Sequence, residues 1–356
     1  MSRFIELLRQ HKQSLIEHYE SQLNQDKYQA INAMLSCKTS ISRQTNWCCS
    51  HCSHHEQHPL SCGHRHCPQC QHQTTMAWLN RQRLKLLPSH YFMVTFTLPF
   101  EFRIIASTQP KALYQLMFQV AAKVMKGFAA RQHQGEMGYT MVLHTHNRRR
   151  DIHPHIHIIV PCGYYQKNRQ QWHKGEMAYL YNELALASVW RAKILDAFNQ
   201  HPTLALPKRY PSTWIAHCTK VGYGEHAFEY LSRYLYRGVL PDKDIIRITD
   251  KSVTFKYIDS ETKQTKTRKL RILEFLWLIL QHVLPKGLQR VRDYGFLRGN
   301  AKKLRLQIQL LLLNTKHWTQ PVSPKVSKAI RTCPCCQHEM TCLGVSRLSE
   351  PKGILR

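Results

Sequence analysis

Two short motifs carry residue types that could form a metal-dependent nucleophilic site. The first is His153-Pro-His155-Ile-His157. In a strand, residues two apart point to the same face, so these histidines would align while Ile156 and Ile158 pack into the core. Imidazoles on one face can bind a divalent cation, and we therefore expect His155 and His157 to be metal ligands. Candidates for the remaining coordination, which the sequence leaves open, are His153, His144, His146, Glu225 and Glu229.

The second motif lies about seventy residues later, in a segment from Glu225 to Arg237 that we predict to be helical. It places Tyr230 and Tyr234 four residues apart, on one face of the helix. A tyrosine presented to a metal ion can attack a phosphodiester. The arginine pair at Arg233 and Arg237 could bind phosphates near these hydroxyls. Aromatic residues at this spacing more often pack in a core, so the spacing alone is weak evidence for chemistry.

A third group consists of cysteines in two Cys-x-x-Cys turns separated by fourteen residues. This is close to the spacing of a four-thiolate zinc site, so we expect Cys49, Cys52, Cys67 and Cys70 to hold a structural Zn²⁺. Neighbouring side chains, chiefly Cys62 and His66, could replace one of these ligands, and a second zinc is an open alternative. Near the end of the chain, Cys333-Pro-Cys335-Cys336 with Cys342 could supply half of such a second site.

The charge of the chain indicates a polyanionic partner. There are 51 Lys and Arg against 22 Asp and Glu, a formal net charge of +29. Nucleic acid fits this balance best, because no apolar anchor accompanies the basic residues. The longest apolar stretch, 272–280, is too short to span a bilayer, so we expect a cytoplasmic protein with reduced thiols. The basic residues closest to the motifs, and so predicted to contact DNA, are Arg65, Arg81, Arg83, Arg148, Arg149, Arg150, Arg233 and Arg237.

Hydrophobic periodicity predicts an α+β chain in three parts. Residues 1–88 would form an N-terminal helix and a zinc-binding DNA-binding domain, 89–300 the catalytic domain, and 301–356 a helical and Cys-containing tail. We predict strands at 91–98, 139–146, 155–160, 214–217, 245–249 and 253–258, and helices at 1–35, 76–87, 111–131, 176–198, 225–237, 272–284 and 301–314.

The motifs occur in an order that resembles the rolling-circle transposases of bacterial insertion sequences, the HUH class with an N-terminal zinc-binding domain. The matching segments cover most of residues 45–300. They are Ser61 to Gln71, the Phe-Thr-Leu-Pro strand at 96–99, the His-Pro-His-x-His strand, the Tyr-Leu-x-Arg-Tyr-x-x-Arg helix at 230–237, the hairpin with 253–257, and Val283 to Gly287 leading into Arg290, Arg292 and Tyr294-Gly295.

The resemblance implies an HUH nuclease-like domain, in which a central antiparallel sheet with flanking helices places the metal-binding strand beneath the tyrosine helix. By motif, His155 and His157 would hold Mg²⁺ or Mn²⁺, and Tyr230 and Tyr234 would be the nucleophiles. The implied substrate is DNA, mainly single-stranded or hairpin element ends and target DNA, in a nucleoid-associated bacterial protein. Two rival interpretations are a plasmid replication initiator or relaxase with the same chemistry, and a zinc-dependent DNA-binding protein without catalysis.

Overall fold

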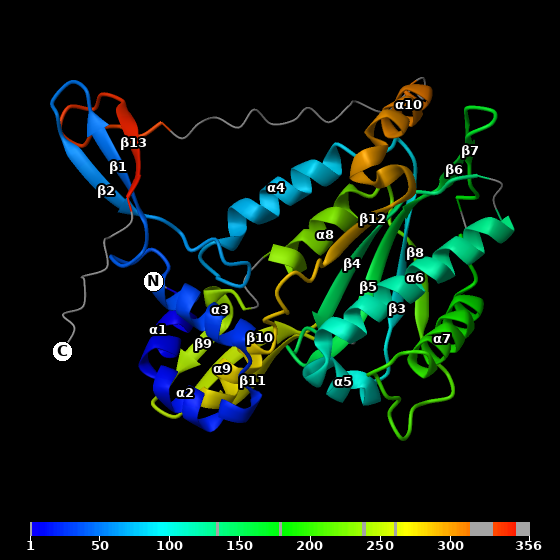
Figure 1. Ribbon diagram of the computed structural model, residues 1–356, viewed down its shortest axis with the longest axis horizontal. Coiled ribbons are helices and arrows are strands. Elements are labelled where there is room, and N and C mark those ends of the chain that lie inside the picture. Colours follow the sequence, from blue (N-terminus) through cyan, green and yellow to red (C-terminus); the bar gives the residue numbers. More distant parts are fainter. Residues whose placement is uncertain are drawn as a thin grey trace.

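The computed structural model describes residues 2–132, 135–177, 180–236, 240–259, 262–313 and 330–346, without the side chains of 71–74, 132 and 233–236. A five-stranded sheet occupies the centre of the larger part of the molecule (Figure 1). Its strands lie in the order β12, β4, β5, β3, β8, and every neighbouring pair is antiparallel. The bounds are β12 Val291–Tyr294, β4 Tyr139–His146, β5 Ile152–Pro161, β3 Tyr91–Thr97 and β8 Ala216–Lys220.

One face of the sheet packs against long helices. Alternate side chains of the central strands, such as Leu143 and Ile156, are fully buried there. They contact α6 (Pro110–Gln132) and α7 (Glu183–Asn199), which together supply much of the main apolar core. Since side chains alternate along a strand, burying these residues sends their neighbours to the opposite face.

The opposite face of the sheet is covered by two other helices. Val142 and Ile159 point to this side and pack against α4 (Gln71–Arg83) and α8 (Glu225–Tyr236). The apolar contact is smaller than on the first face, because histidines and threonines of the same strands share the surface. This second face is where the histidine motif lies.

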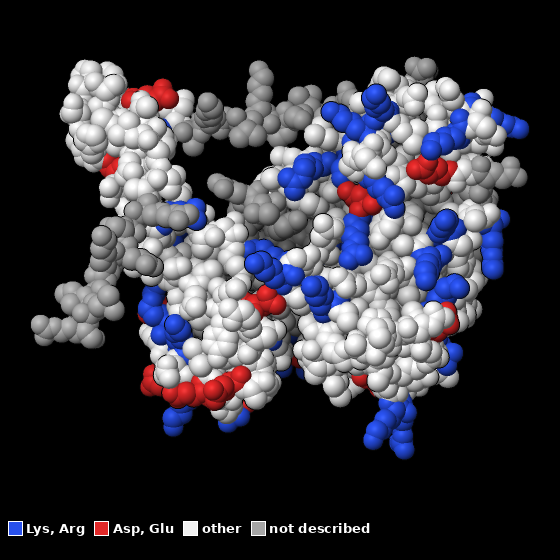
Figure 2. All heavy atoms as spheres, in the orientation of Figure 1, with Lys and Arg blue, Asp and Glu red and all other residues white. Residues whose placement is uncertain are grey.

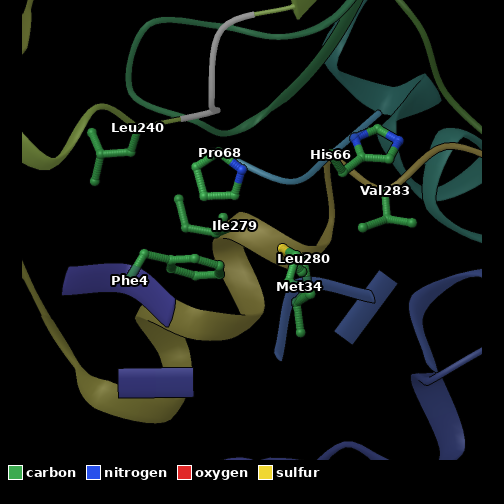
Figure 3. Close-up of a pocket in the computed structure, with 8 residues that line it drawn as sticks. All are labelled: Phe4, Met34, His66, Pro68, Leu240, Ile279, Leu280 and Val283. Atoms are coloured by element: carbon green, nitrogen blue, oxygen red, sulfur yellow. The ribbon is translucent and has the colours of Figure 1, made fainter. Parts of the chain in front are cut away.

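The N-terminal helices form a second core with a segment much later in the chain. Phe4 and Ile31 are buried against Phe275, and Cys67 belongs to the same cluster. Figure 3 shows a small pocket at this junction, lined by Phe4, Met34, His66, Pro68, Leu240, Ile279, Leu280 and Val283. The elements involved are α1 (Arg3–Gln10), α2 (Lys12–His18), α3 (Gln25–Ser36) and α9 (Ile272–Leu280), beside a sheet of β9 (Ile245–Ile248), β10 (Ser252–Ile258) and β11 (Thr265–Arg271).

A small three-stranded sheet joins the two ends of the chain. Strand β1 (Gln44–Cys49) pairs with β2 (His55–Pro59) on one side and with β13 (Met340–Ser346) on the other. In Figure 1 these strands, blue and red, lie side by side away from the central sheet. The predicted tail of residues 301–356 is therefore not one unit, since α10 (Lys302–Leu312) packs near Phe296 and β13 belongs to this sheet.

The predicted α+β class, with an antiparallel central sheet and a cysteine-rich N-terminal part, is confirmed and is consistent with an HUH-like fold. Strand β5 begins at Ile152, earlier than predicted. Helix α7 begins only at Glu183, where Asn182 accepts a hydrogen bond from the amide of Ala185 and caps the helix. Seven strands in the described part of the chain were missed by the sequence patterns: β1, β2, β6 (Gly163–Gln166), β7 (Gln171–Lys174), β11, β12 and β13. Among the described residues, no helix is both long and apolar enough to cross a membrane.

Candidate active site and metal centres

Three histidines of the central sheet converge on its second face. His144 on β4 lies directly opposite His155 on β5, and His157 is two residues further along β5. Their ring centroids are 4.6 to 5.1 Å apart, and one ring nitrogen of each lies within 4.8 Å of the other two. The antiparallel register alone thus brings three imidazoles to one point, as a facial metal site requires.

Hydrogen bonds of the neighbouring backbone and side chains orient two of these rings. The Nδ1 atom of His155 donates to the carbonyl oxygen of His153 at 2.7 Å, because a carbonyl can only accept. The Nδ1 atom of His157 is hydrogen-bonded to Oγ1 of Thr95 on β3 at 2.8 Å. Both contacts leave Nε2 available to a cation, and such outer-shell partners set the tautomer and orientation of metal-binding histidines.

Burial keeps these imidazoles neutral. It lowers the pKa of His155 to about 4 and that of His157 to about 3, and the neighbouring His155 adds a smaller effect in the same direction for His157. Burial likewise holds the pKa of His144 well below its ordinary value. At neutral pH all three side chains therefore carry the lone pairs that a divalent cation needs.

The other candidate ligands have different partners. His153 lies inside β5 but outside the convergent group, and its carbonyl oxygen accepts a hydrogen bond from His155. His146 follows a bulge in β4, and its ring stacks on His282 with centroids 3.5 Å apart. Glu225 and Glu229 both accept hydrogen bonds from Arg83, each at 2.9 Å. Of the candidates that the sequence left open, His144 is the one that the structure groups with His155 and His157.

The tyrosine helix lies over the same face. Helix α8 packs on the sheet through Phe228 and Leu231, and its Tyr230 is half-buried with its ring centroid 6.4 Å from that of His157. Tyr234 is one turn further along α8, and its side chain is outside the described part of the chain, as is that of Arg233. Arg237 lies outside the described residues altogether.

The predicted zinc ligands are divided between two separate clusters, so the set Cys49, Cys52, Cys67 and Cys70 was wrong as a single site. The first cluster contains Cys37, Cys62, Cys67 and Cys70. Its sulfurs lie close together, with Cys70 Sγ 3.4 Å from that of Cys37 and 3.6 Å from that of Cys62. The physical reason for the division is that β1 and β2 carry the Cys49 turn away from α4, whose start holds Cys70.

The first cluster is built into the N-terminal core. The backbone amide of Cys62 donates to Cys37 Sγ, and that of His64 donates to Cys62 Sγ, both at 3.4 Å. Cys37 and Cys67 are buried in the core that α9 shares. Cys62, predicted only as a substitute, is thus a full member, whereas His66 accepts a hydrogen bond from the amide of Leu284 and stands outside the cluster.

The second cluster contains Cys49, Cys52, Cys333 and Cys336. Cys49 Sγ lies 3.4 Å from Cys336 Sγ, and Cys52 Sγ lies 3.5 Å from Cys333 Sγ. Cys333 and Cys336, two of the four cysteines that the sequence marked for half of a second site, therefore meet the first Cys-x-x-Cys turn. Cys335 and Cys342, from the same segment, are exposed and outside the cluster.

Two of the arginines predicted to contact DNA have hydrogen-bond partners within the molecule. The guanidinium of Arg65 donates to the carbonyl oxygens of Leu284, Pro285 and Leu288, at 2.6 to 2.8 Å. Arg83 binds the two glutamates of α8 and so fastens α4 to α8. The guanidinium groups of both arginines donate to acceptors within the molecule. These acceptors would compete with DNA phosphates for the same N–H groups.

The remaining predicted basic residues lie nearer to solvent. Arg81 is exposed on α4, and Arg149 is exposed with an ion pair to Asp151 at 3.6 Å. Arg148 and Arg150 are half-buried, and Arg150 donates to the carbonyl of Arg148. Figure 2 shows Lys and Arg spread over the sheet-containing body, whereas the β1–β2–β13 module has mostly uncharged atoms on this face.

Several residues of these centres were missed or undecided from the sequence. Cys37 precedes Cys62 by 25 positions and belongs to no Cys-x-x-Cys turn. No ligand spacing in the sequence therefore pointed to it. His144 was a candidate without a rank, because the alternation of β4 predicts its face but not its register with β5.

Gly295 of the Tyr-Gly motif has φ 57°, and a Cβ there would meet the carbonyl of Met137, which explains the glycine.

The fold and the grouped side chains define a class of α+β protein in which convergent histidines of an antiparallel sheet lie under a tyrosine helix. Residues 138–305 match the family model described as "Putative transposase", and residues 7–98 match the "Transposase zinc-binding domain". The chain therefore matches two transposase domain models, in the order that the motifs predicted.

Two relatives carry matching descriptions. The "Putative transposase y4qJ" of Sinorhizobium fredii is 28% identical, covering 90% of this chain and 90% of its own length. The "Transposase for insertion sequence element IS801" of Pseudomonas savastanoi pv. phaseolicola is 25% identical, covering 79% of this chain and 73% of its own. No solved structure matches the chain significantly.

Proposed function

We propose that this transposase cuts single-stranded DNA at the ends of its element and rejoins it through a 5′-phosphotyrosine, in rolling-circle transposition. The observation that carries the proposal is the placement of Tyr230 beside a convergent group of three neutral histidines. A metal-binding strand beneath a tyrosine helix matches a strand-cleaving site better than a passive DNA-binding surface. The basic charge of the whole chain supports a nucleic-acid substrate.

The three histidines fit a divalent cation. Their Nδ1 atoms on β5 are engaged by the protein, so Nε2 of His155 and His157 can face a shared point with His144. We assign Mg²⁺ or Mn²⁺ to this group, with His144 as third ligand. When bound, the cation polarises the phosphoryl oxygens of the scissile phosphate and offsets the charge that develops on them.

Tyr230 would supply the attacking oxygen. Its ring is held by packing of α8 on the sheet, which limits the positions that the hydroxyl can take. A free tyrosine ionises only near pH 10, so positioning must contribute much of the rate. The phenolic oxygen forms a bond to phosphorus as the bond from phosphorus to the 3′-oxygen breaks. The phenolic proton is lost, and the departing 3′-oxygen takes up a proton to become a free hydroxyl.

Rejoining reverses these bonds without an energy source. A 3′-hydroxyl attacks the phosphotyrosine, and the tyrosine recovers its proton. Tyr234 lies one turn further along the same helix, and we assign it the second of two alternating linkages, one for the donor strand and one for the target strand. The exposed arginines Arg81 and Arg149 would contact the DNA backbone, which makes binding fall steeply with salt.

The cluster of Cys37, Cys62, Cys67 and Cys70 is our assignment for the structural zinc of the zinc-binding domain. Four thiolates from a short chain segment are typical of a closed structural site. We expect Cys67→Ser to lose this zinc and specific DNA binding, because Cys67 is fully buried where the cluster joins the core. Cys48→Ser is the matched control, since Cys48 is outside both clusters; equal zinc content and equal specific binding in the two variants would contradict the assignment.

The deciding experiment is formation of a covalent adduct. The purified protein is incubated with labelled single-stranded oligonucleotides carrying an element end, with Mg²⁺ or Mn²⁺, and is analysed on a denaturing gel. We expect a labelled protein band that disappears with chelator. Tyr230→Phe and Tyr234→Phe should each lose strand transfer while still binding DNA, and mapping the adduct identifies which oxygen attacked.

Tyr223→Phe provides the matched control, because Tyr223 is exposed just before α8 and faces His90 rather than the histidine group. It should cleave and transfer strands as the parent does. Absence of any adduct under all metal conditions, with DNA binding intact, would leave only a zinc-dependent DNA-binding protein. Full activity of Tyr230→Phe would remove Tyr230 from the mechanism.

A further inference from the structure

The Cys-x-x-Cys turn at Cys49 to Cys52 has a characteristic backbone conformation. The amide of Ser53 donates to the carbonyl of Cys49 at 2.9 Å, and the amide of Cys49 donates to the carbonyl of His54 at 2.9 Å. Ser53 has φ 56°, in the left-handed region that non-glycine residues rarely adopt. The turn thus points two sulfurs to the same side and reverses the chain between β1 and β2.

The turn at the far end of the chain repeats this conformation. Here the amide of Gln337 donates to the carbonyl of Cys333 at 2.9 Å, and the amide of Cys333 donates to the carbonyl of His338 at 2.8 Å. Gln337 has φ 59°, matching Ser53 of the first turn. The two segments therefore form the same turn, and their sulfurs face each other. The facing pairs are Cys49 with Cys336, 287 positions apart, and Cys52 with Cys333, 281 positions apart.

The distances between the sulfurs fit a tetrahedral metal site. Across the cluster they are 3.4 Å for Cys49 to Cys336 and 3.5 Å for Cys52 to both Cys333 and Cys336. Four sulfurs at the Zn–S bond length of about 2.3 Å would stand about 3.8 Å apart in a tetrahedron. A disulfide needs about 2.05 Å, so the geometry is that of thiolates around a common centre.

The apolar core shared by these segments is small. The apolar cluster around the turns comprises Cys49, Cys333 and Met340, with Trp47 and Cys336 partly buried. Such a core is far smaller than an independently stable module requires, and modules of this size depend on a metal or a disulfide. Outside this cluster, β1 pairs with β13, and Arg331 contacts Glu56 and the ring of Trp47.

We propose that Cys49, Cys52, Cys333 and Cys336 bind a second Zn²⁺, and that this zinc fastens the C-terminal segment to the N-terminal zinc-binding domain. Cys333 and Cys336 lie beyond both matched domains, which end at residues 98 and 305. The zinc-binding part of the protein is therefore completed only when both ends of the chain are present. A chain that stops before residue 333 has two cysteines of this site exposed and without their partners.

A mixed ligand set is the competing arrangement at the same place. His51 and His338 stack with ring centroids 3.9 Å apart, and both can reach Cys336. The Nδ1 atom of His338 donates to the carbonyl of Cys336 at 2.9 Å, which leaves one ring nitrogen for other partners. We favour the four thiolates because the two turns direct all four sulfurs at one point.

Zinc content of the full-length protein tests the proposal. Native mass spectrometry should find two zinc ions per chain in the parent, and one in Cys333→Ser and in Cys336→Ser. Cys342→Ser is the matched control, since Cys342 is an exposed cysteine of the same segment, and it should retain two. His338→Ala should also retain two. Equal zinc content in the parent and Cys333→Ser, or loss of one zinc in His338→Ala, would each overturn the four-thiolate assignment.

A second measurement keeps all four cysteines and so does not require a cysteine variant to fold. A protease site inserted between residues 314 and 329 of the full chain allows the C-terminal fragment to be cut off. With zinc present, the fragment should remain bound during gel filtration, and a zinc chelator should release it. Separation of the fragment with zinc present would overturn the proposal. Neither readout requires DNA cleavage, so both stand apart from the proposed transposase chemistry.

Discussion

The histidine group on the central sheet and the cysteine cluster of the β1–β2–β13 module are both candidate metal centres, but they are held in different ways. His144, His155 and His157 project from adjacent strands of a sheet packed on both faces. The cysteines project from two turns with a very small apolar cluster around them. The sheet can arrange its ligands without a metal, whereas the module has only a small apolar core with which to do so.

This difference between the two sites fits the functions that we propose for them. A catalytic site must keep its ligands in place while substrate exchanges, so pre-organisation by a rigid scaffold is an advantage. A structural zinc only has to stay bound, and its binding free energy can serve as the folding free energy of a small module. The comparison predicts that metal removal has opposite consequences in the two regions.

Removal of zinc should give the largest effect. Structural zinc sites contribute about 10 kcal/mol or more of binding free energy, so the β1–β2–β13 module should unfold when a strong chelator takes the metal. Hydrogen exchange measured by mass spectrometry should then show full exchange in 44–59 and 340–346. The central strands β3, β4 and β5 should keep their protection. Protected amides in β13 after complete zinc removal would contradict the comparison.

Substitution of the sheet histidines should abolish activity and leave the fold intact. We expect His157→Ala and His144→Ala each to lower DNA cleavage by about 10³-fold or more, because the bound cation supplies several kcal/mol of transition-state stabilisation. His153→Ala is the matched control on the same strand and should stay near the parent rate. Cleavage rates measure the loss of activity, and circular dichroism spectra show whether the fold is intact. An equal loss of cleavage in His153→Ala and His144→Ala would contradict the assignment of His144 as the third ligand.

The histidine pattern illustrates what the sequence could predict. The alternation of His and Ile placed His155 and His157 on one face of a strand, and the structure agrees, because a period of two needs only local geometry. The third member depends on how β4 is aligned with β5, which no local pattern contains. His144 and His146 were equivalent in the sequence, and a bulge between them separates their positions.

The cysteines and arginines were harder to predict for the same reason. Spacing alone joined Cys49 and Cys52 to Cys67 and Cys70, whereas the partners of the first pair lie more than 280 positions away. Arg65 was predicted to contact phosphate from its charge, but backbone carbonyls at 284–288 accept its hydrogen bonds. Ligand type was predictable from the sequence, and ligand grouping required the tertiary structure.

A smaller effect should come from the residue that orients His157. Thr95→Val removes the hydroxyl bonded to Nδ1 while keeping the shape of the side chain. Loss of such an outer-shell partner typically lowers metal affinity by about 10 to 100-fold. Cleavage titrated against Mn²⁺ should therefore shift to higher metal concentration, with most of the rate recovered at saturation. Thr219→Val, at an exposed position of β8, is the control; an unchanged Mn²⁺ dependence of Thr95→Val would mean that the sheet alone orients the ring.

The smallest effect concerns the pH dependence of stability in the sheet region. Burial lowers the pKa of His146 to about 3, and that of its stacking partner His282 well below the ordinary value. A folded-state pKa below that of the unfolded chain means that stability is fully present above pH about 6.5 and is lost as the pH falls from there towards 3. Each such histidine contributes a slope of up to about 1.4 kcal/mol per pH unit. Urea unfolding of the sheet at pH 7 and pH 5 should show this loss, and His146→Phe, which keeps the ring stack without a titrating group, should make it shallower. An identical slope in His146→Phe would assign the acid sensitivity to His282 and the histidines of the metal group instead.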